Sequence, residues 1–377
     1  MKKIVLMALL ATACNTALRA QSNESTEEKQ YGRTVTKWAS TPKFGGYAIG
    51  SYKYSDQEGK HNGDGFNARL LRLYVDGNIL TDFKYRVQLE MNGDNSASNK
   101  SPHLKDFFLA WSHWKELEVK VGQFKRSFTF ENPYNPWDVG VGDYSQLTKK
   151  LAGMNDYCGG EATNNGGRDI GIQLQGDVLP VGSDKHRLFH YQVAVMNGQG
   201  INHADSNAKK DLMGTLQIQP VKDLYIGVFG WKGNMTYTNS SKETISTDRN
   251  RYALSAKYEH NGWSARAEYA HQTGHKMADY WINGEGKQVL NVDKASNGRA
   301  DAWYATVGVP CTPWLKVYAK YDAYRDNARN NSLSSIYSLC PNFQLHKNVM
   351  FQAQYNYVHT KASGSHHEIW GEVYFRF

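Results

Sequence analysis

Hydrophobic and polar side chains alternate along many short segments of this chain. In residues 83–91, FKYRVQLEM, every odd-numbered side chain is apolar or aromatic and every even-numbered one is polar or charged. A period of two puts the two sets on opposite faces of a β-strand. The same pattern recurs at 106–111, 117–121, 169–175, 189–195, 251–259, 263–269, 315–322, 351–357 and 369–377. The chain is therefore restricted to sheets that have one apolar and one polar face.

Weaker segments extend this series near 43–54, 66–75, 211–219, 224–231, 301–309 and 334–340. Together they make about sixteen strands of ~9–11 residues, the length that crosses a membrane at a tilt. The connections alternate between long (55–65, 92–103, 126–167, 198–210, 232–249, 271–299, 323–333, 359–367) and short (76–82, 113–116, 179–187, 220–223, 260–262, 310–313, 341–348). Long external loops and short periplasmic turns are typical of outer-membrane barrels.

The polar face excludes a compact sandwich. Burying Lys84, Arg86 or Glu90 inside such a core would cost several kcal/mol unless each were paired. In a wide barrel that face lines water and the apolar face meets lipid, which also agrees with a mean hydropathy of −0.65. The sequence predicts an all-β, antiparallel, up-and-down transmembrane barrel of about sixteen strands. The last strand, ending on Phe377, closes it and resembles the assembly signal of bacterial barrels.

The N-terminus predicts export. Lys2 and Lys3 precede an apolar core at 4–13, so 1–20 is expected to be a signal peptide, with lipidation at Cys14 as the alternative. Residues 21–42 form a polar periplasmic arm and 43–377 the barrel. Cleavage lowers the formal charge of +8 to about +5, and the basic residues are not clustered. We therefore expect no nucleic-acid partner.

Signs of an enzyme or a metal site are weak. The chain contains no GxSxG, HExxH or P-loop motif, so we expect neither catalysis nor a cofactor. Histidines four apart on a strand lie ~13 Å apart, too far to share one ion, and no metal site is expected. Cys311 and Cys340 could pair if their turns are neighbours; two semi-buried thiols are the alternative.

The third long connection, 126–167, is the strongest candidate for a functional element. It contains aromatic residues, a Pro-Trp pair and a helix-like SQLTKKLAG run. Loops of this length are usually functional or disordered, and this one could fold inward to narrow the wide lumen of a sixteen-stranded barrel. Basic side chains on the lumen face and near this loop are the candidate pore-lining residues: Lys84, Arg86, Lys120, Lys125, Arg126, Lys149, Lys150 and Arg168. Alternatively, Lys149 and Lys150 only solvate a short helix.

Several stretches resemble the phosphate-selective porin O and P family. They are RLLRLYVDGNILTDFKYRVQLE (69–90), DFFLAW with VGQFKRSFTFEN (106–132), and RDIGIQLQGDVL (168–179). Family members often have Pro before the second Phe of the VGQFK segment, where this chain has Ser127. The resemblance implies a sixteen-stranded, often trimeric outer-membrane channel with an inward-folded third loop.

The expected function is diffusion of small hydrophilic solutes, with a preference for anions such as phosphate implied by the resemblance. Rings of Lys and Arg favour anions, but acidic residues on the predicted lumen face nearly balance the basic ones. A general porin therefore remains open. The alternative from another class is a barrel with a plugged lumen that serves as a surface adhesin or antigen.

Overall fold

The computed structural model describes residues 28–30, 33–35, 39–58, 64–92, 101–154, 157–158, 161–162, 165–205, 207–238, 244–274, 280–282, 288–290 and 298–377. The predicted signal peptide, 1–20, lies outside these residues. Of the predicted arm, 21–42, the structure describes two short paired strands, β1 (Glu28–Gln30) and β2 (Arg33–Val35), and the residues from Ala39 on. Within the described part of the chain, no helix has the length and apolar character needed to span a membrane.

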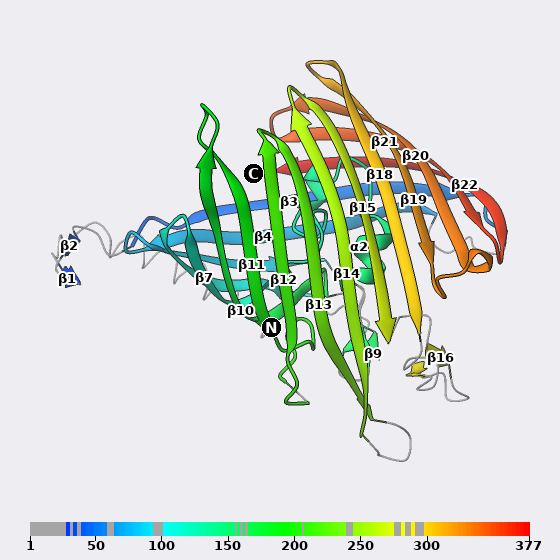
Figure 1. Ribbon diagram of the computed structural model, residues 1–377. Coiled ribbons are helices and arrows are strands. Elements are labelled where there is room, and N and C mark those ends of the chain that lie inside the picture. The colour runs from blue at the N-terminus through cyan, green and yellow to red at the C-terminus, as the bar shows by residue number, and fades with distance from the viewer. Residues whose placement is uncertain are drawn as a thin grey trace, which may run out of the picture.

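Sixteen antiparallel strands form a closed barrel, as the sequence predicts (Figure 1). Each strand pairs with its neighbours in chain order, and the last pairs with the first, Glu368 to Arg376 lying opposite Ser55 to Tyr47. The strands are β3 (Lys43–Ser55), β4 (Gly65–Ile79), β5 (Phe83–Glu90), β6 (His103–Trp114), β7 (Leu117–Lys125), β10 (Arg168–Val181), β11 (His186–Met196), β12 (Asp211–Val221), β13 (Leu224–Thr238), β14 (Thr244–His260), β15 (Trp263–Gly274), β18 (Arg299–Thr312), β19 (Leu315–Arg325), β20 (Leu333–His346), β21 (Val349–Thr360) and β22 (Gly364–Arg376).

The remaining described elements are short. The pairs β8 (Tyr157–Cys158) with β9 (Glu161–Ala162), and β16 (Tyr280–Ile282) with β17 (Gln288–Leu290), lie in the connections of the barrel. The helical turns are η1 (Pro136–Asp138), α2 (Gln146–Leu151) and η3 (Asn330–Ser332). Closure continues to the chain end, where the Phe377 amide donates to the Gly46 carbonyl at 3.0 Å and the Gly46 amide donates to the Phe377 carbonyl at 3.0 Å.

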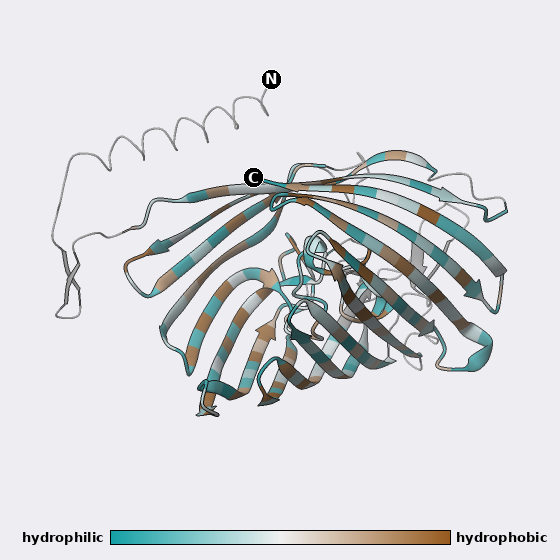
Figure 2. Cartoon of the chain, turned by 90° about the horizontal axis from the view of Figure 1, so that it is seen from above, coloured by the Kyte–Doolittle hydropathy of each residue, from teal (hydrophilic) through white to brown (hydrophobic). Residues whose placement is uncertain are grey.

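The barrel is apolar outside and polar inside. Large hydrophobic side chains such as Val193, Leu216 and Leu254 are exposed on the outer face, while Gln352, Asp322 and Arg251 are buried toward the interior. In Figure 2, hydrophobic and hydrophilic bands alternate along the strands. This arrangement agrees with the predicted faces, and the pairs β11–β12, β14–β15 and β21–β22 keep one register along their paired length.

Two predicted long connections are shorter than the sequence indicated. Residues 232–249 and 359–367 were expected to be loops, but β13 runs to Thr238, β14 starts at Thr244, β21 runs to Thr360 and β22 starts at Gly364. Strand ends such as these are mostly polar, so their period-two signal is weak. They pair nevertheless, because beyond the apolar belt both faces of a strand can meet water.

Cys311 and Cys340 do not pair with each other. Cys311 is exposed and Cys340 is buried, and both are free thiols. The pairing is therefore absent, and of the alternative, two semi-buried thiols, the unpaired state holds while Cys311 is exposed rather than semi-buried. Cys340 packs with Val139 and Val141 of the segment that enters the barrel.

The same substitution at two adjacent positions tests which face meets lipid. Leu216 in the middle of β12 is 49% exposed on the outer face, and Gln217 beside it faces inward. We expect Leu216→Arg to lower the free energy of unfolding in a bilayer by about 2–4 kcal/mol, because it buries a cation in hydrocarbon. Gln217→Arg should change it little. Urea unfolding of the barrel in lipid vesicles, followed by tryptophan fluorescence, measures both. Equal losses would contradict an outward apolar face.

Candidate functional site: the inward segment and a basic wall

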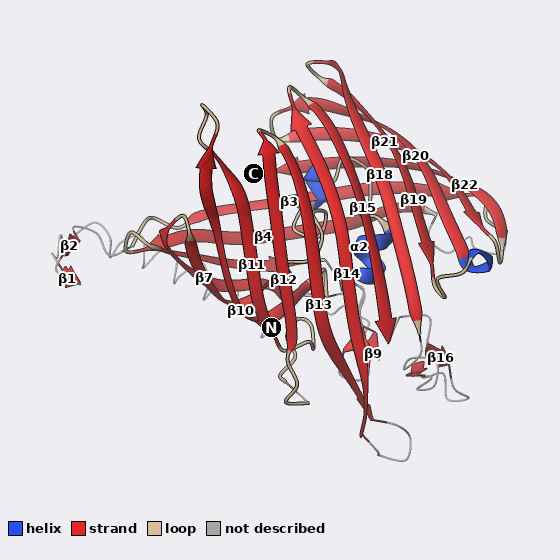
Figure 3. Ribbon diagram, viewed as in Figure 1, coloured by secondary structure: helices blue, strands red, loops and turns tan. Residues whose placement is uncertain are grey.

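The segment after β7 enters the barrel. In Figure 3, α2 and η1 lie within the ring of strands. Local sequence sets both turns: the Asn135 side chain accepts from the Trp137 amide to begin η1, and the Ser145 hydroxyl accepts from the Thr148 amide to begin α2. Residues 126–154 thus form an inward-folded third loop, as predicted from the sequence.

Apolar contacts hold this loop against one side of the barrel. The ring of Phe128 lies 5.6 Å from that of Trp231, and the ring of Phe130 lies 5.4 Å from that of Phe229. Leu147 and Leu151 of α2 are buried in the same cluster, among inward-facing alanines of β14, β15 and β18. The small alanine side chains leave room for the helix. This alanine stripe (Ala253, Ala270, Ala300 and Ala302) is a sequence signal that the period-two reading did not use.

Carboxylates of the wall accept hydrogen bonds from the loop backbone. Glu268 on β15 accepts from the amides of Phe130 and Glu131 at 2.7 and 2.8 Å, and from the Tyr304 hydroxyl at 2.6 Å. Asp322 on β19 accepts from the Gln146 amide at 2.9 Å. These buried acceptors satisfy loop amides that no secondary structure pairs.

A second attachment reaches the opposite side. Asp143 pairs with Lys149 at 2.8 Å and with Arg69 of β4 at 3.4 Å, and Arg69 also pairs with Glu372 of β22 at 2.8 Å. Burial disfavours ionisation of Asp143, but Lys149 and Arg69 outweigh burial and lower the pKa of this carboxyl well below its usual range. Burial alone would lower the pKa of Lys149, but the Asp143 carboxylate outweighs burial and raises it. The loop is therefore attached to both sides of the barrel.

Of the predicted residues Lys149 and Lys150, Lys149 lies at this second attachment, whereas Lys150 lies on the β19 side of the loop. Lys149 is engaged by Asp143, and Lys150 lies with its Nζ 4.2 Å from the centre of the Tyr324 ring. Burial, reinforced by Lys149, lowers the pKa of Lys150. Neither lysine lines the two cavities beside β4 to β7 and β10, where the other predicted pore-lining residues lie.

Basic side chains gather on the wall formed by β4 to β7 and β10. A cavity of about 230 Å³ lies between this wall and loop residues Pro133, Tyr134 and Asn135. Among its described lining residues, the basic ones are Arg72, Arg86, Lys120, Lys125, Arg126 and Arg168, and the carboxylate is Asp106. A second cavity of about 600 Å³ toward the short-turn end shares Arg86 and Lys120 and adds Lys84. We call these side chains the basic wall.

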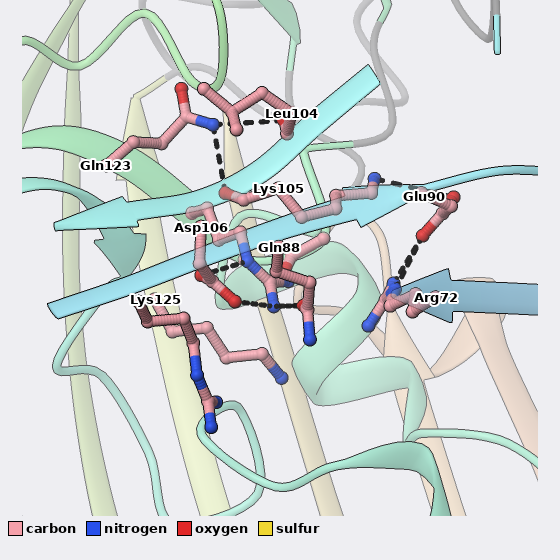
Figure 4. A network of polar contacts seen from close by, with 12 residues as sticks. Arg72, Gln88, Glu90, Leu104, Lys105, Asp106, Gln123 and Lys125 are labelled. Carbon is pink, nitrogen blue, oxygen red and sulfur yellow. Dashed lines mark hydrogen bonds and ion pairs between the residues drawn. The ribbon is translucent and has the colours of Figure 1, made fainter. Parts of the chain in front are cut away.

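Most guanidinium groups of the basic wall are paired. Arg168 donates to both oxygens of Asp106 at 2.7 and 2.9 Å, and Arg86 donates to both oxygens of Asp76 at 2.7 Å. Figure 4 shows Glu90 between Arg72 and Lys105, with ion-pair distances of 2.6 and 3.6 Å. Two cations therefore share the Glu90 carboxylate.

Lys125 differs from its neighbours. Its Nζ donates to the carbonyl oxygens of Asn132 and Tyr134 at 2.6 and 2.7 Å and to the Tyr144 hydroxyl at 3.3 Å. These acceptors are neutral, so Lys125 fixes the loop to the wall, and no carboxylate in the described part of the chain forms an ion pair with it. Arg126, next to it, is fully buried and pairs with Asp169 at 2.8 Å, with its guanidinium 4.9 Å from the Trp231 ring. Arg126 therefore fastens the start of the loop.

Sequence reasoning missed Arg69, Arg72 and Lys105. Two bulges explain why Arg69 and Lys105 were missed, whereas Arg72 lies in regular register with Tyr47. Arg69 is the extra residue where the β3–β4 register shifts, and Lys105 is the extra residue where the β5–β6 register shifts. A bulge puts two successive residues opposite one partner, so inward side chains no longer follow strict alternation.

Comparison with known proteins agrees with this architecture. A family model described as Gram-negative porin matches residues 6–363. No curated protein sequence matches the chain. Among solved structures, OmpF of Salmonella typhi in complex with daunomycin is similar, with a TM-score of 0.61 and 12% identity over 93% of this chain and 100% of that one. The outer membrane channel DcaP of Acinetobacter baumannii has a TM-score of 0.60 and 12% identity over 93% and 100%. The trimer form of OmpT of Vibrio cholerae has a TM-score of 0.57 and 10% identity over 90% and 100%.

Substitution of the wall carboxylate Glu268 tests whether its hydrogen bonds hold the loop in place. In Glu268→Gln, the amide nitrogen cannot accept, so one loop N–H loses its partner. A hydrogen bond to a charged group is worth about 1.5–3 kcal/mol, so exchange of the Phe130 and Glu131 amides should become roughly ten- to hundredfold faster. Hydrogen-exchange mass spectrometry of fragments covering 128–132 measures this. Glu372→Gln, on the opposite wall, should leave these fragments unchanged; faster exchange in both variants would contradict a specific role for Glu268.

Proposed function

The chain belongs to the Gram-negative porin family, and we infer that, among the small hydrophilic solutes that pass this outer-membrane channel, it prefers anions. The observation that carries the proposal is the basic wall. Its cations outnumber its carboxylates, and the loop residues that face it across the narrow cavity, Pro133, Tyr134 and Asn135, are uncharged. A cation excess in a narrow passage with low-dielectric walls raises the local concentration of anions.

The arrangement of the charges supports a broad preference for anions. Arg168 and Arg86 already use two donors each on Asp106 and Asp76, so these forks are not free to hold a phosphate. The wall lysines without a carboxylate partner among the described residues are Lys84 and Lys125. Such charges attract anions through their electrostatic field rather than by fixed hydrogen bonds. Phosphate is therefore one of several anions that pass. The resemblance to the phosphate-selective family supports phosphate as a natural member of this set.

We further propose that the channel is a homotrimer in the outer membrane. The support is one structural neighbour, a trimer form of OmpT, together with the general tendency of identical chains to form closed symmetric assemblies. Chemical cross-linking of the protein extracted in mild detergent tests this. A ladder ending at three chains is expected, and a single-chain band under the same conditions would contradict it.

A plugged barrel that serves as an adhesin is the second candidate. The observation that favours it is that the loop is attached to both sides of the barrel, through Glu268 on β15 and through Arg69 on β4. The cavities of about 230 and 600 Å³ along the basic wall favour a conducting channel. Single-channel recording separates the two, since a plugged barrel gives no steady ohmic current.

Charge reversal on the basic wall tests the anion preference. In a KCl gradient, we expect the reversal potential of the wild type to lie on the anion-selective side. The double variant Lys84→Glu and Lys120→Glu should move it toward cation selectivity, because it replaces two cations of the passage by anions. Lys347→Glu, in the exposed turn between β20 and β21, makes the same kind of change outside the passage and should move it little. A cation-selective wild type, or equal shifts in both variants, would contradict the proposal.

The predicted pair Lys149 and Lys150 gives a separate comparison. Their double alanine variant should shift the reversal potential less than the change on the basic wall. Lys149 is matched by Asp143, and Lys150 lies against Tyr324. A larger shift would move the selective part of the channel to the second attachment of the loop.

A further inference from the structure

A separate cavity lies below the loop at the short-turn end of the barrel. Its volume is about 820 Å³, and the turns at 260–262 and 312–314 form its rim. Its inner lining comes from the loop residues Tyr134, Trp137 and Gly140 and from strands β15, β19 and β20. In a porin this end faces the periplasm, so we call the cavity the periplasmic vestibule.

Loop residues line the inner end of the vestibule and are hydrogen bonded to the barrel wall. The Gly140 carbonyl accepts from Asn342 Nδ2 at 2.9 Å and from Gln352 Nε2 at 3.1 Å, and the Val139 carbonyl accepts from the Arg266 guanidinium. Tyr134 borders both the vestibule and the cavity at the basic wall. The vestibule is therefore a pocket on the opposite side of Tyr134 from the basic wall.

Two buried polar side chains in this vestibule have unused hydrogen-bonding groups. Arg266 is 4% exposed and Ser264 is 5% exposed, and both line the cavity. Among the described residues, the Nε and one terminal nitrogen of Arg266 have no hydrogen-bond partner, and neither has the Ser264 hydroxyl. A buried donor without a partner costs about 1–3 kcal/mol, and more when it is charged. Such groups are usually satisfied by a ligand or water.

The two side chains lie on one face of β15, two positions apart, so they point into the same space. Lys257 lies opposite Arg266 in the β14–β15 register, and Lys316 of β19 lines the vestibule. The cavity also contains the carboxylates Asp138 and Glu259. Glu259 accepts from the Tyr134 hydroxyl at 3.3 Å, and no carboxylate in the described part of the chain forms an ion pair with Arg266.

We propose that Arg266 and Ser264 bind an oxyanion, the phosphate or carboxylate group of a small solute, in the periplasmic vestibule. A guanidinium with free N–H groups and a hydroxyl beside it match the several acceptor oxygens of such a group. The Tyr134 ring, 4.8 Å from the Arg266 guanidinium carbon, fixes the guanidinium on its other face. The site goes beyond conduction along the basic wall, because it retains a solute at a fixed place.

Titration calorimetry of the folded chain in detergent tests this site without any current measurement. Sodium phosphate and sodium acetate are the two probes. Saturable binding of one anion per chain is expected for phosphate, acetate or both, and the probe that binds identifies the chemistry. If neither probe binds in a saturable way, the proposal is overturned.

Variants locate the binding. Ser264→Ala removes one donor and should raise the half-saturating anion concentration roughly tenfold, and Arg266→Met should abolish saturation. Because Arg266 also holds Val139, hydrogen exchange of 128–142 shows whether the loop stays in place; Ser264 has no such contact with the loop. Lys222→Ala, in the exposed turn between β12 and β13, removes a charge outside the vestibule and should bind like the wild type.

Wild-type affinity in both Ser264→Ala and Arg266→Met would place the anion elsewhere and overturn the assignment. The outcome is independent of the reversal-potential measurement. A channel that prefers anions but has no such site gives an anion-selective reversal potential without saturable binding. A barrel that has the site but no anion preference gives saturable binding without that reversal potential.

Discussion

The structure depends on one constraint, which is that backbone amides and carbonyls in hydrocarbon must all be hydrogen bonded within the protein. Sixteen strands meet it by closing on themselves, with β22 paired to β3 along most of its length. Closure then sets the distribution of side chains. Apolar residues such as Leu216 and Leu254 cover the outside, while Arg251 and Gln352 fill the inside.

A barrel of this width has an interior that side chains from the wall alone do not fill, and the third loop occupies part of it. Two kinds of contact position the loop. Phe128, Phe130 and α2 pack on Phe229, Trp231 and a stripe of alanines, and carboxylates such as Glu268 accept hydrogen bonds from the loop backbone. The apolar contacts bury the loop side chains against the wall. The carboxylates fix the orientation of the loop, because each accepts from particular backbone amides.

The position of the loop divides the polar interior into regions with different chemistry. On one side of Tyr134, the basic wall carries cations that exceed its carboxylates and faces uncharged loop residues. On the other side, the periplasmic vestibule contains Arg266 and Ser264 with unused donors. The first region lines a cavity with an excess of basic side chains, and the second offers a fixed set of hydrogen-bond donors. A single segment, 126–154, creates both.

Alternation in the sequence determined the fold class, the number of strands, the face each strong strand turns to lipid, and the existence of a long third loop. These features are local, because a period of two is visible within a single strand. It was also enough to place Lys84, Arg86 and Lys120 on the inner face. Only the tertiary structure decided which cations meet. The bulges that turn Arg69 and Lys105 inward, the pairing of Lys149 with Asp143 rather than with the basic wall, and the burial of Arg126 against Asp169 all depend on partners distant in the chain. Neighbouring residues in the sequence do not reveal such partners, because register shifts and loop docking are set by contacts between strands.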